Sequence, residues 1–180
     1  MPCGAVTDQS TTTTASATVQ DTFLAEFYKP DGTTVLYTDS IPFSNIDPNK
    51  TFALSDGRSV GDNKSDVGVY CISSIKATWY LKIGITAGNI PEGKLKYWVS
   101  QPYIWTGTQS IQTDGTVIPN PPAWTPIPVG KTAVIYQSGS SDTVNAPFGT
   151  LITLSFQLDP AGLTKGSYAA TITYTMATAP

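Results

Sequence analysis

Histidine is absent from this 180-residue chain, and cysteine occurs only twice. Without imidazole the chain cannot build a histidine-containing metal site or a nucleophilic triad with a histidine base. Two cysteines are also too few for a tetrahedral thiolate site. These absences remove the side chains on which most metal centres and many hydrolases depend.

Charge and long apolar runs are scarce as well. Charged residues make up 13% of the chain and the formal net charge is −3, which excludes the basic surface of a nucleic-acid-binding protein. No apolar stretch approaches the ~18 residues of a transmembrane helix, so we expect no membrane span. The chain also opens without a basic and apolar leader, which for an exported protein indicates a sequence that is already processed.

The acidic residues offer little for catalysis. Glu26 and Glu92 are the only glutamates, and neither lies in a recognisable motif. The loop 55–68 carries three aspartates, but their spacing does not fit an EF-hand. Other aspartates occupy turns, where Asp is favoured for backbone reasons. We therefore expect no enzyme, no metal site and no cofactor.

Alternating apolar and polar residues are the strongest pattern in the chain. In Thr150–Leu158, one face carries Ile152, Leu154, Phe156 and Leu158, and the other carries Thr153, Ser155 and Gln157. The segments Ala77–Ile85 and Ser167–Met176 alternate in the same way. A period of two indicates strands with one face on a core and one face in water.

Shorter segments predict further strands. Lys29–Gly32 is a turn signal that makes a hairpin of the segments on either side. The remaining predicted strands are Thr22–Tyr28, Thr33–Thr38, Ile41–Phe43, Thr51–Leu54, Val69–Ile72, Lys94–Ser100 and Thr132–Tyr136. No segment keeps a period of 3.6, so helices should be short or absent.

This pattern predicts an all-β antiparallel sandwich over residues 21–180, preceded by an N-terminal extension, residues 1–20. Residues 101–130 interrupt the pattern with many prolines and aromatics, and we expect them to form a long excursion or to cover a sheet edge.

Two surface features have alternative interpretations. Trp98, Tyr103, Trp105 and Trp124 could bind a sugar through their flat ring faces, or they could cover core or a subunit contact. Asn49 and Asn63 begin N-glycosylation sequons, which arise often by chance.

The cysteine pair, Cys3 and Cys71, predicts one disulfide and hence an oxidising compartment. The alternative is two free thiols in a cytosolic protein, which the Thr-, Ser- and Gly-rich composition disfavours.

The last predicted strand ends close to Pro180, so no later segment covers its far edge. An uncovered edge offers its backbone groups to another strand. The candidate acceptor edge consists of Tyr168, Ala170, Ile172, Tyr174 and Met176.

The C-terminal residues also carry a family resemblance. Gly166-Ser-Tyr168 with the following Ala-Ala-Thr-Ile-Thr-Tyr-Thr, and Leu154–Leu158 before it, is similar to the terminal strands of fimbrial and spore-coat-U-like subunits. The placement of an early Cys and a second Cys near the second or third strand also resembles these subunits. The resemblance implies an immunoglobulin-like sandwich that lacks its last strand, which a neighbour's N-terminal extension supplies by β-strand addition.

On this resemblance residues 4–20 are the candidate donor strand. Its candidate groove-filling residues are Ala5, Val6, Ala15, Ala17 and Val19. The disulfide would then lie between subunits if Cys3 travels with the donor, or within one chain if the extension belongs to its own sheet.

The sequence thus predicts a structural subunit of an extracellular filament or cell-surface coat. Its partners would be further copies of itself, other surface subunits or glycans. The alternative function is a monomeric adhesion or carbohydrate-binding module that uses the exposed aromatics.

Overall fold

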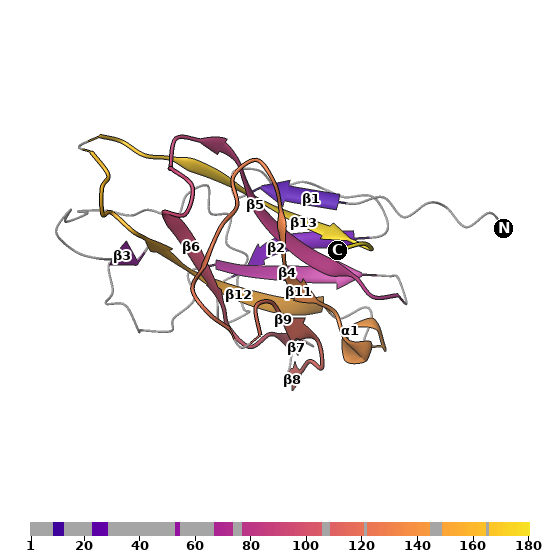
Figure 1. Ribbon diagram of the computed structural model, residues 1–180. Coiled ribbons are helices and arrows are strands. Elements are labelled where there is room, and N and C mark those ends of the chain that lie inside the picture. Colours follow the sequence, from indigo (N-terminus) through magenta and orange to yellow (C-terminus); the bar gives the residue numbers. More distant parts are fainter. Residues whose placement is uncertain are drawn as a thin grey trace.

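The computed structural model (Figure 1) describes residues 9–12, 23–28, 53–54, 67–73, 77–105, 109–120, 122–144, 149–164 and 166–180. Within these ranges the chain is an all-β sandwich of two antiparallel sheets with one short helix, α1 (Ser140–Val144). The fold class predicted from the alternating segments is therefore confirmed, as is the expectation that helices are short.

The first sheet contains the C-terminal strand. Its strands lie in the order β1, β13, β5, β11, β9, and each neighbouring pair is antiparallel. They are β1 (Gln9–Thr12), β5 (Tyr80–Gly88), β9 (Thr116–Val117), β11 (Ala133–Gln137) and β13 (Ala170–Ala177).

The second sheet is built around β12 (Gly149–Leu158), and its strands lie in the order β10, β6, β12, β4, β2. The short strands β3 and β7 also pair with β12, and β8 pairs with β7. The bounds are β2 (Phe23–Tyr28), β3 (Ala53–Leu54), β4 (Val67–Ser73), β6 (Leu95–Val99), β7 (Tyr103–Trp105), β8 (Ser110–Gln112) and β10 (Thr125–Pro126).

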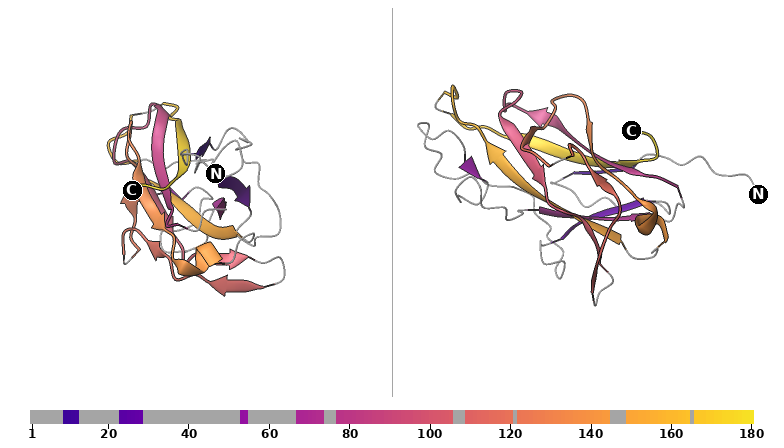
Figure 2. Two further views of the ribbon diagram at one scale, coloured as in Figure 1. Left: turned by 90° about the vertical axis from the view of Figure 1, so that its right-hand side faces the viewer. Right: turned by 60° about the horizontal axis from the view of Figure 1, so that its bottom comes forward.

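The two sheets form the two layers of the sandwich (Figures 1 and 2). The core between them consists of the apolar side chains of the alternating strands. β5, β12 and β13 each contribute every second residue to it, as a period of two requires. The side chains of β5, β12 and β13 in this core are Leu81, Ile83, Ile85, Ile152, Leu154, Phe156, Ile172, Tyr174 and Met176, each 4% exposed or less.

The polar face of β12 contradicts the sequence-based prediction. Thr153, Ser155 and Gln157 were expected in water, but they are 6%, 2% and 2% exposed. The prediction is wrong because all residues of β12 are buried, so its second face is covered as well as the face toward the core. Alternation of polarity therefore identifies which side of β12 faces the core, but it does not show whether the other side is exposed to solvent.

Residues 101–130 supply short strands at the sheet edges. β9 lies at one edge of the first sheet and β10 at one edge of the second. Pro126 lies in β10, where a residue without a backbone N–H is tolerated because the strand is at an edge.

The sandwich has two distinct ends along its strands. At the end that we call the helix end, Ala177 lies opposite Tyr80, Phe23 lies opposite Ser73, and α1 lies close by (Figure 1). At the opposite end, the turn end, Ala170 lies opposite Gly88. The turn end carries the β5–β6 turn and the loop between β12 and β13 (Figure 2).

Candidate functional site

The edge of the C-terminal strand is the principal candidate site. The sequence predicted that no later part of the chain covers it, but an earlier part does. β1 pairs with β13 antiparallel, with Gln9 opposite Met176 and Thr12 opposite Thr173. The prediction of an open edge is therefore wrong for the single chain, since its own N-terminal segment completes the sheet.

The candidate acceptor residues take part in this edge through their backbone. Ile172, Tyr174 and Met176 point into the core and are 4%, 0% and 1% exposed. Burial raises the pKa of the Tyr174 phenol. Ala170 is half-buried, and Tyr168 precedes the strand, where its hydroxyl donates to the carbonyl oxygen of Thr164 at 2.9 Å. A strand that adds here therefore gains backbone hydrogen bonds beside an already filled core.

The candidate donor residues Ala5, Val6, Ala15, Ala17 and Val19 lie outside the described ranges. The segment that pairs, Gln9–Thr12, lies within the predicted donor segment 4–20 but between the residues named as groove-filling. A signal was present in the run of threonines from Thr11, because β-branched residues favour strands.

Asn89 fixes the chain just before β13 at the turn end. Its side-chain amide donates to the carbonyl oxygen of Ser167 at 3.0 Å, and its side-chain oxygen accepts from the backbone N–H of Ala169 at 2.7 Å. Its own backbone N–H donates to the carbonyl oxygen of Ala169 at 2.9 Å. These contacts continue the pairing of β5 and β13 beyond their last ladder residues.

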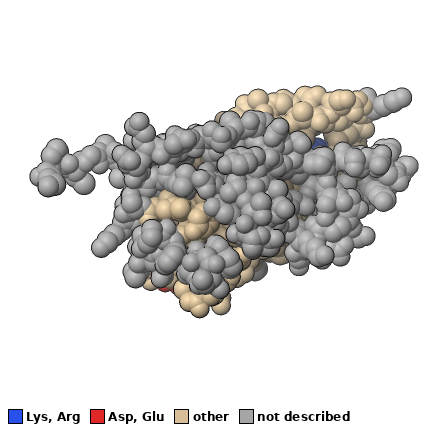
Figure 3. Space-filling model, turned by 180° about the vertical axis from the view of Figure 1, so that it is seen from behind, with Lys and Arg blue, Asp and Glu red and all other residues tan. Residues whose placement is uncertain are grey.

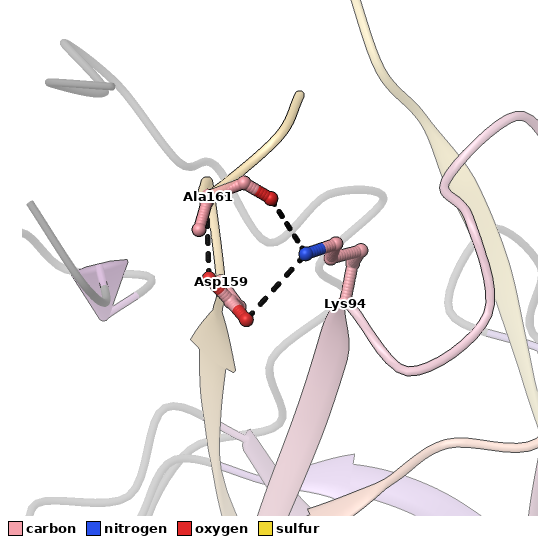
Figure 4. Close-up of polar contacts among 3 residues, drawn as sticks. All are labelled: Lys94, Asp159 and Ala161. Atoms are coloured by element: carbon pink, nitrogen blue, oxygen red, sulfur yellow. Dashed lines mark hydrogen bonds and ion pairs between the residues drawn. The ribbon is translucent and has the colours of Figure 1, made fainter. Parts of the chain in front are cut away.

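A second clamp at the turn end joins β6 to the end of β12 (Figure 4). The Lys94 ammonium lies 3.6 Å from a carboxylate oxygen of Asp159 and donates to the carbonyl oxygen of Ala161 at 2.6 Å. The other carboxylate oxygen of Asp159 accepts from the backbone N–H of Ala161 at 3.0 Å. The loop between β12 and β13 is thus held at both of its sides, by Lys94 and by Asn89.

At the helix end, Asp142 places a buried carboxylate among four donors. It is 5% exposed, and one oxygen accepts from the hydroxyls of Thr113 and Tyr136 and from the backbone N–H of Gly139, each at 2.7 Å. The other oxygen accepts from the hydroxyl of Thr150 at 2.5 Å. Because protein donors occupy both oxygens, this carboxylate ties strands to α1 rather than facing a substrate.

Asp114 attaches the neighbouring loop to the first turn of α1. Its carboxylate accepts from the hydroxyls of Ser140 and Ser141 and, at 2.9 Å, from the backbone N–H of Ser141. These donors, first that of Ser140, lower the pKa of the Asp114 carboxyl. The sequence attributed Asp114 to a turn, but it acts as a cap supplied to the helix from a distant part of the chain.

The predicted disulfide is not present in the part of the chain that the structure describes. The Cys71 thiol is free and 1% exposed, in the core between the sheets, while Cys3 lies outside the described ranges. Burial, and after it the nearby Asp142 carboxylate, raise the pKa of this thiol. Cys71 occupies an inward position of β4, where a small apolar side chain fits the core, and its pairing with Cys3 stays a prediction.

Two of the four candidate ligand aromatics come together. Trp98 on β6 and Trp124 just before β10 are both half-buried, with ring centroids 5.9 Å apart and planes tilted by 54°. Tyr103 is half-buried on β7. The side chain of Trp105 and both sequon asparagines, Asn49 and Asn63, lie outside what the structure describes.

The described residues on the face drawn in Figure 3 are mainly uncharged. Among the described residues no group of three or more Cys, Asp or Glu could hold a metal ion. Within the same ranges, no helix is long and apolar enough to cross a membrane.

Comparisons of the chain with protein-family models, with curated proteins and with solved structures found no match.

Proposed function

We propose that this chain is a structural subunit of an extracellular filament or surface coat, and that it assembles by adding a β-strand from one copy to another. The observation that carries the proposal is the pairing of β1 with β13. This pairing places an N-terminal strand on the edge that the fimbria-like C-terminal segment was expected to offer.

The same pairing can form between copies because it uses only backbone groups at a sheet edge. When β1 of one copy replaces β1 of another, the hydrogen bonds broken and formed are of the same kind, so the exchange costs little beyond association itself. Exchange of an identical element between protomers is a low-cost route to assembly. The C-terminal residues from Gly166 onward support it through their similarity to fimbrial and spore-coat-U-like subunits.

Two single-cysteine variants test the proposal. Ser10 and Thr175 are register partners, and directly opposed residues of an antiparallel pair lie about 4.5–5.5 Å apart at Cα, within the range of a disulfide. Both variants carry Cys3→Ser, and Cys71 stays because it is buried. Mixing Ser10→Cys with Thr175→Cys under oxidation should give disulfide-linked heterodimers.

The matched control replaces Thr175→Cys by Thr86→Cys, an exposed position on β5 that is not opposite β1. This mixture should stay unlinked. The proposal fails if Ser10→Cys and Thr175→Cys link only when both are in one chain, because β1 then stays on its own sheet.

A second candidate function rests on the paired rings of Trp98 and Trp124. Indole faces stack on sugars, and both rings are partly exposed on β6 and beside β10. On this proposal the chain is a carbohydrate-binding or adhesion module. Binding to a glycan array that Trp124→Ala abolishes and Tyr103→Phe retains would support it, and an array without any bound glycan would contradict it.

A further inference from the structure

We infer that in the assembled form the helix end of each copy packs against the turn end of the next copy. This inference rests on the proposed function, and it adds the surfaces that meet. It follows from the direction of β1, the position of β2 and the length of chain between them.

The direction of β1 sets where its own subunit must lie. Gln9 lies opposite Met176 near the helix end, and Thr12 lies opposite Thr173, closer to the turn end. The chain therefore leaves β1 heading for the turn end of whichever sandwich β1 completes. β2 begins at Phe23, which lies opposite Ser73 at the helix end.

These two positions favour a linear arrangement of copies. Within one chain, residues 13–22 have to bring the backbone back from the β13 edge to the helix end. Between copies the same residues continue forward, past the turn end of the acceptor, and the first part of the donor that they meet is its helix end. The connection between β1 and β2 therefore does not have to reverse its direction when β1 is donated to another copy.

The length of the connection is sufficient. From Thr173 to Ala170 the edge of β13 runs on by three residues, or about 10 Å at 3.3 Å per residue. Ten residues can span at most about 35 Å. About 25 Å therefore remains to reach Phe23 of the donor, which allows direct contact between the two ends.

Both ends present fixed surfaces. At the helix end, the contacts of Asp114 with Ser140 and Ser141 hold α1 against its neighbouring loop. At the turn end, Asn89 and Lys94 clamp the loop before β13. Because the two surfaces differ and lie at opposite ends of the sandwich, their repeated contact is heterologous and joins more than two copies head to tail, whereas a two-fold dimer would bring like surfaces together.

Cysteine cross-linking at the two ends tests this arrangement. Thr178 at the helix end and Glu92 at the turn end are both exposed. With Cys3→Ser present, subunits carrying Thr178→Cys and subunits carrying Glu92→Cys are mixed before they assemble, and a short bismaleimide is added to the mixed assembly. Cross-links should join the two variants to each other and should not join either variant to itself. A double variant, Glu92→Cys with Thr178→Cys, should give a ladder that extends beyond the dimer.

The outcomes separate this inference from the proposed function. If Ser10→Cys and Thr175→Cys link between chains but the end positions link only to their own kind, or the double variant stops at a dimer, the end-to-end contact is wrong and strand exchange stands. If Ser10→Cys and Thr175→Cys do not link between chains, the proposed function fails and the end-to-end contact fails with it.

Discussion

The hydrogen bonds of Asp142 hold four separated parts of the chain together. Thr113 follows β8, Tyr136 lies in β11, Gly139 precedes α1 and Thr150 lies in β12. A buried carboxylate is stabilised by this many donors. When the carboxylate is removed, the same donors stay buried without an acceptor, which lowers the stability of the fold. The helix end of the sandwich therefore depends on one side chain.

Replacing that side chain should destabilise the protein strongly. We expect Asp142→Ala to lower the free energy of unfolding by about 3 kcal/mol, because buried hydroxyls and a backbone N–H lose their acceptor. Urea unfolding measures the change. The control is Asp159→Ala, which breaks a partly exposed ion pair with Lys94 and should cost less than about 1 kcal/mol. Equal losses for the two variants would show that the buried Asp142 contacts contribute no more than the partly exposed ion pair.

Cys71 should make the protein sensitive to alkaline pH. Burial raises the pKa of its thiol, so above the ordinary thiol pKa of about 8.5 the unfolded chain releases a proton that the folded chain retains. Stability is thus complete below about pH 8.5 and falls as pH rises, by about 1.4 kcal/mol per pH unit for one group. Above about pH 10 the buried phenols of Tyr136 and Tyr174, whose pKa values are also raised, should add to the loss.

Urea unfolding at a series of pH values measures this dependence. Cys71→Ala should remove the decline between about pH 8.5 and 10 and leave the steeper decline above it. If the native protein shows a flat profile up to pH 10, the thiol does not stay protonated in the core.

Among the strands, the short edge strand β10 depends on an aromatic contact across the sheet. It pairs with β6 through only two residues, Thr125 and Pro126, and the Trp98–Trp124 pair extends that contact by one position. Cross-strand aromatic pairs are a main source of sheet stability.

A double-mutant cycle measures this contact. Trp98→Ala and Trp124→Ala should each lower stability, and the double variant should lose less than their sum by about 0.5–1.5 kcal/mol. Trp79 and Tyr136, with ring centroids 5.5 Å apart in the core, make a poorer test because their removal leaves cavities. Additive losses at Trp98 and Trp124 would mean that the rings are neighbours without mutual stabilisation.

Sequence alternation predicted the core strands well because a period of two is a local property. Leu81, Ile83 and Ile85 are buried as their spacing requires. Which strands become neighbours is not local. The burial of Thr153 and the pairing of Thr12 with Thr173 both depend on residues far away in the chain.

The hydrogen bonds that hold the two ends of the sandwich could not be predicted from the sequence for the same reason. Asn89 and Asp142 belong to no motif, and their partners lie at distances along the chain that no pattern encodes. The two serines before Asp142 do resemble the start of a helix, since Ser and Asp favour that position. That signal locates α1 but does not reveal the contacts of Asp142 with Thr113 and Thr150.

Taken as one unit, the sandwich requires β1 to complete its first sheet. Deleting residues 1–20 should expose the β13 edge, lower the thermal midpoint and abolish ordered assembly by strand exchange, because no donor strand remains. Adding a peptide of residues 1–20 should restore the midpoint but not the assembly, since the peptide fills the edge without linking two copies; thermal unfolding and light scattering measure the two effects. A peptide of the same composition in scrambled order is the control. If the deletion variant is as stable as the full chain and assembles as the full chain does, β1 contributes nothing to the edge.

The central position of β12 also governs when the protein can fold. β12 joins β3, β4, β6 and β7 into one sheet, yet it is synthesised after all four of them. In the same way, β13 is synthesised long after its neighbours β1 and β5. Contacts between such distant segments form slowly, on the order of milliseconds to seconds. Until β12 and β13 have been made, the earlier strands therefore lack the neighbours that join them into either sheet, and their apolar faces wait without a partner.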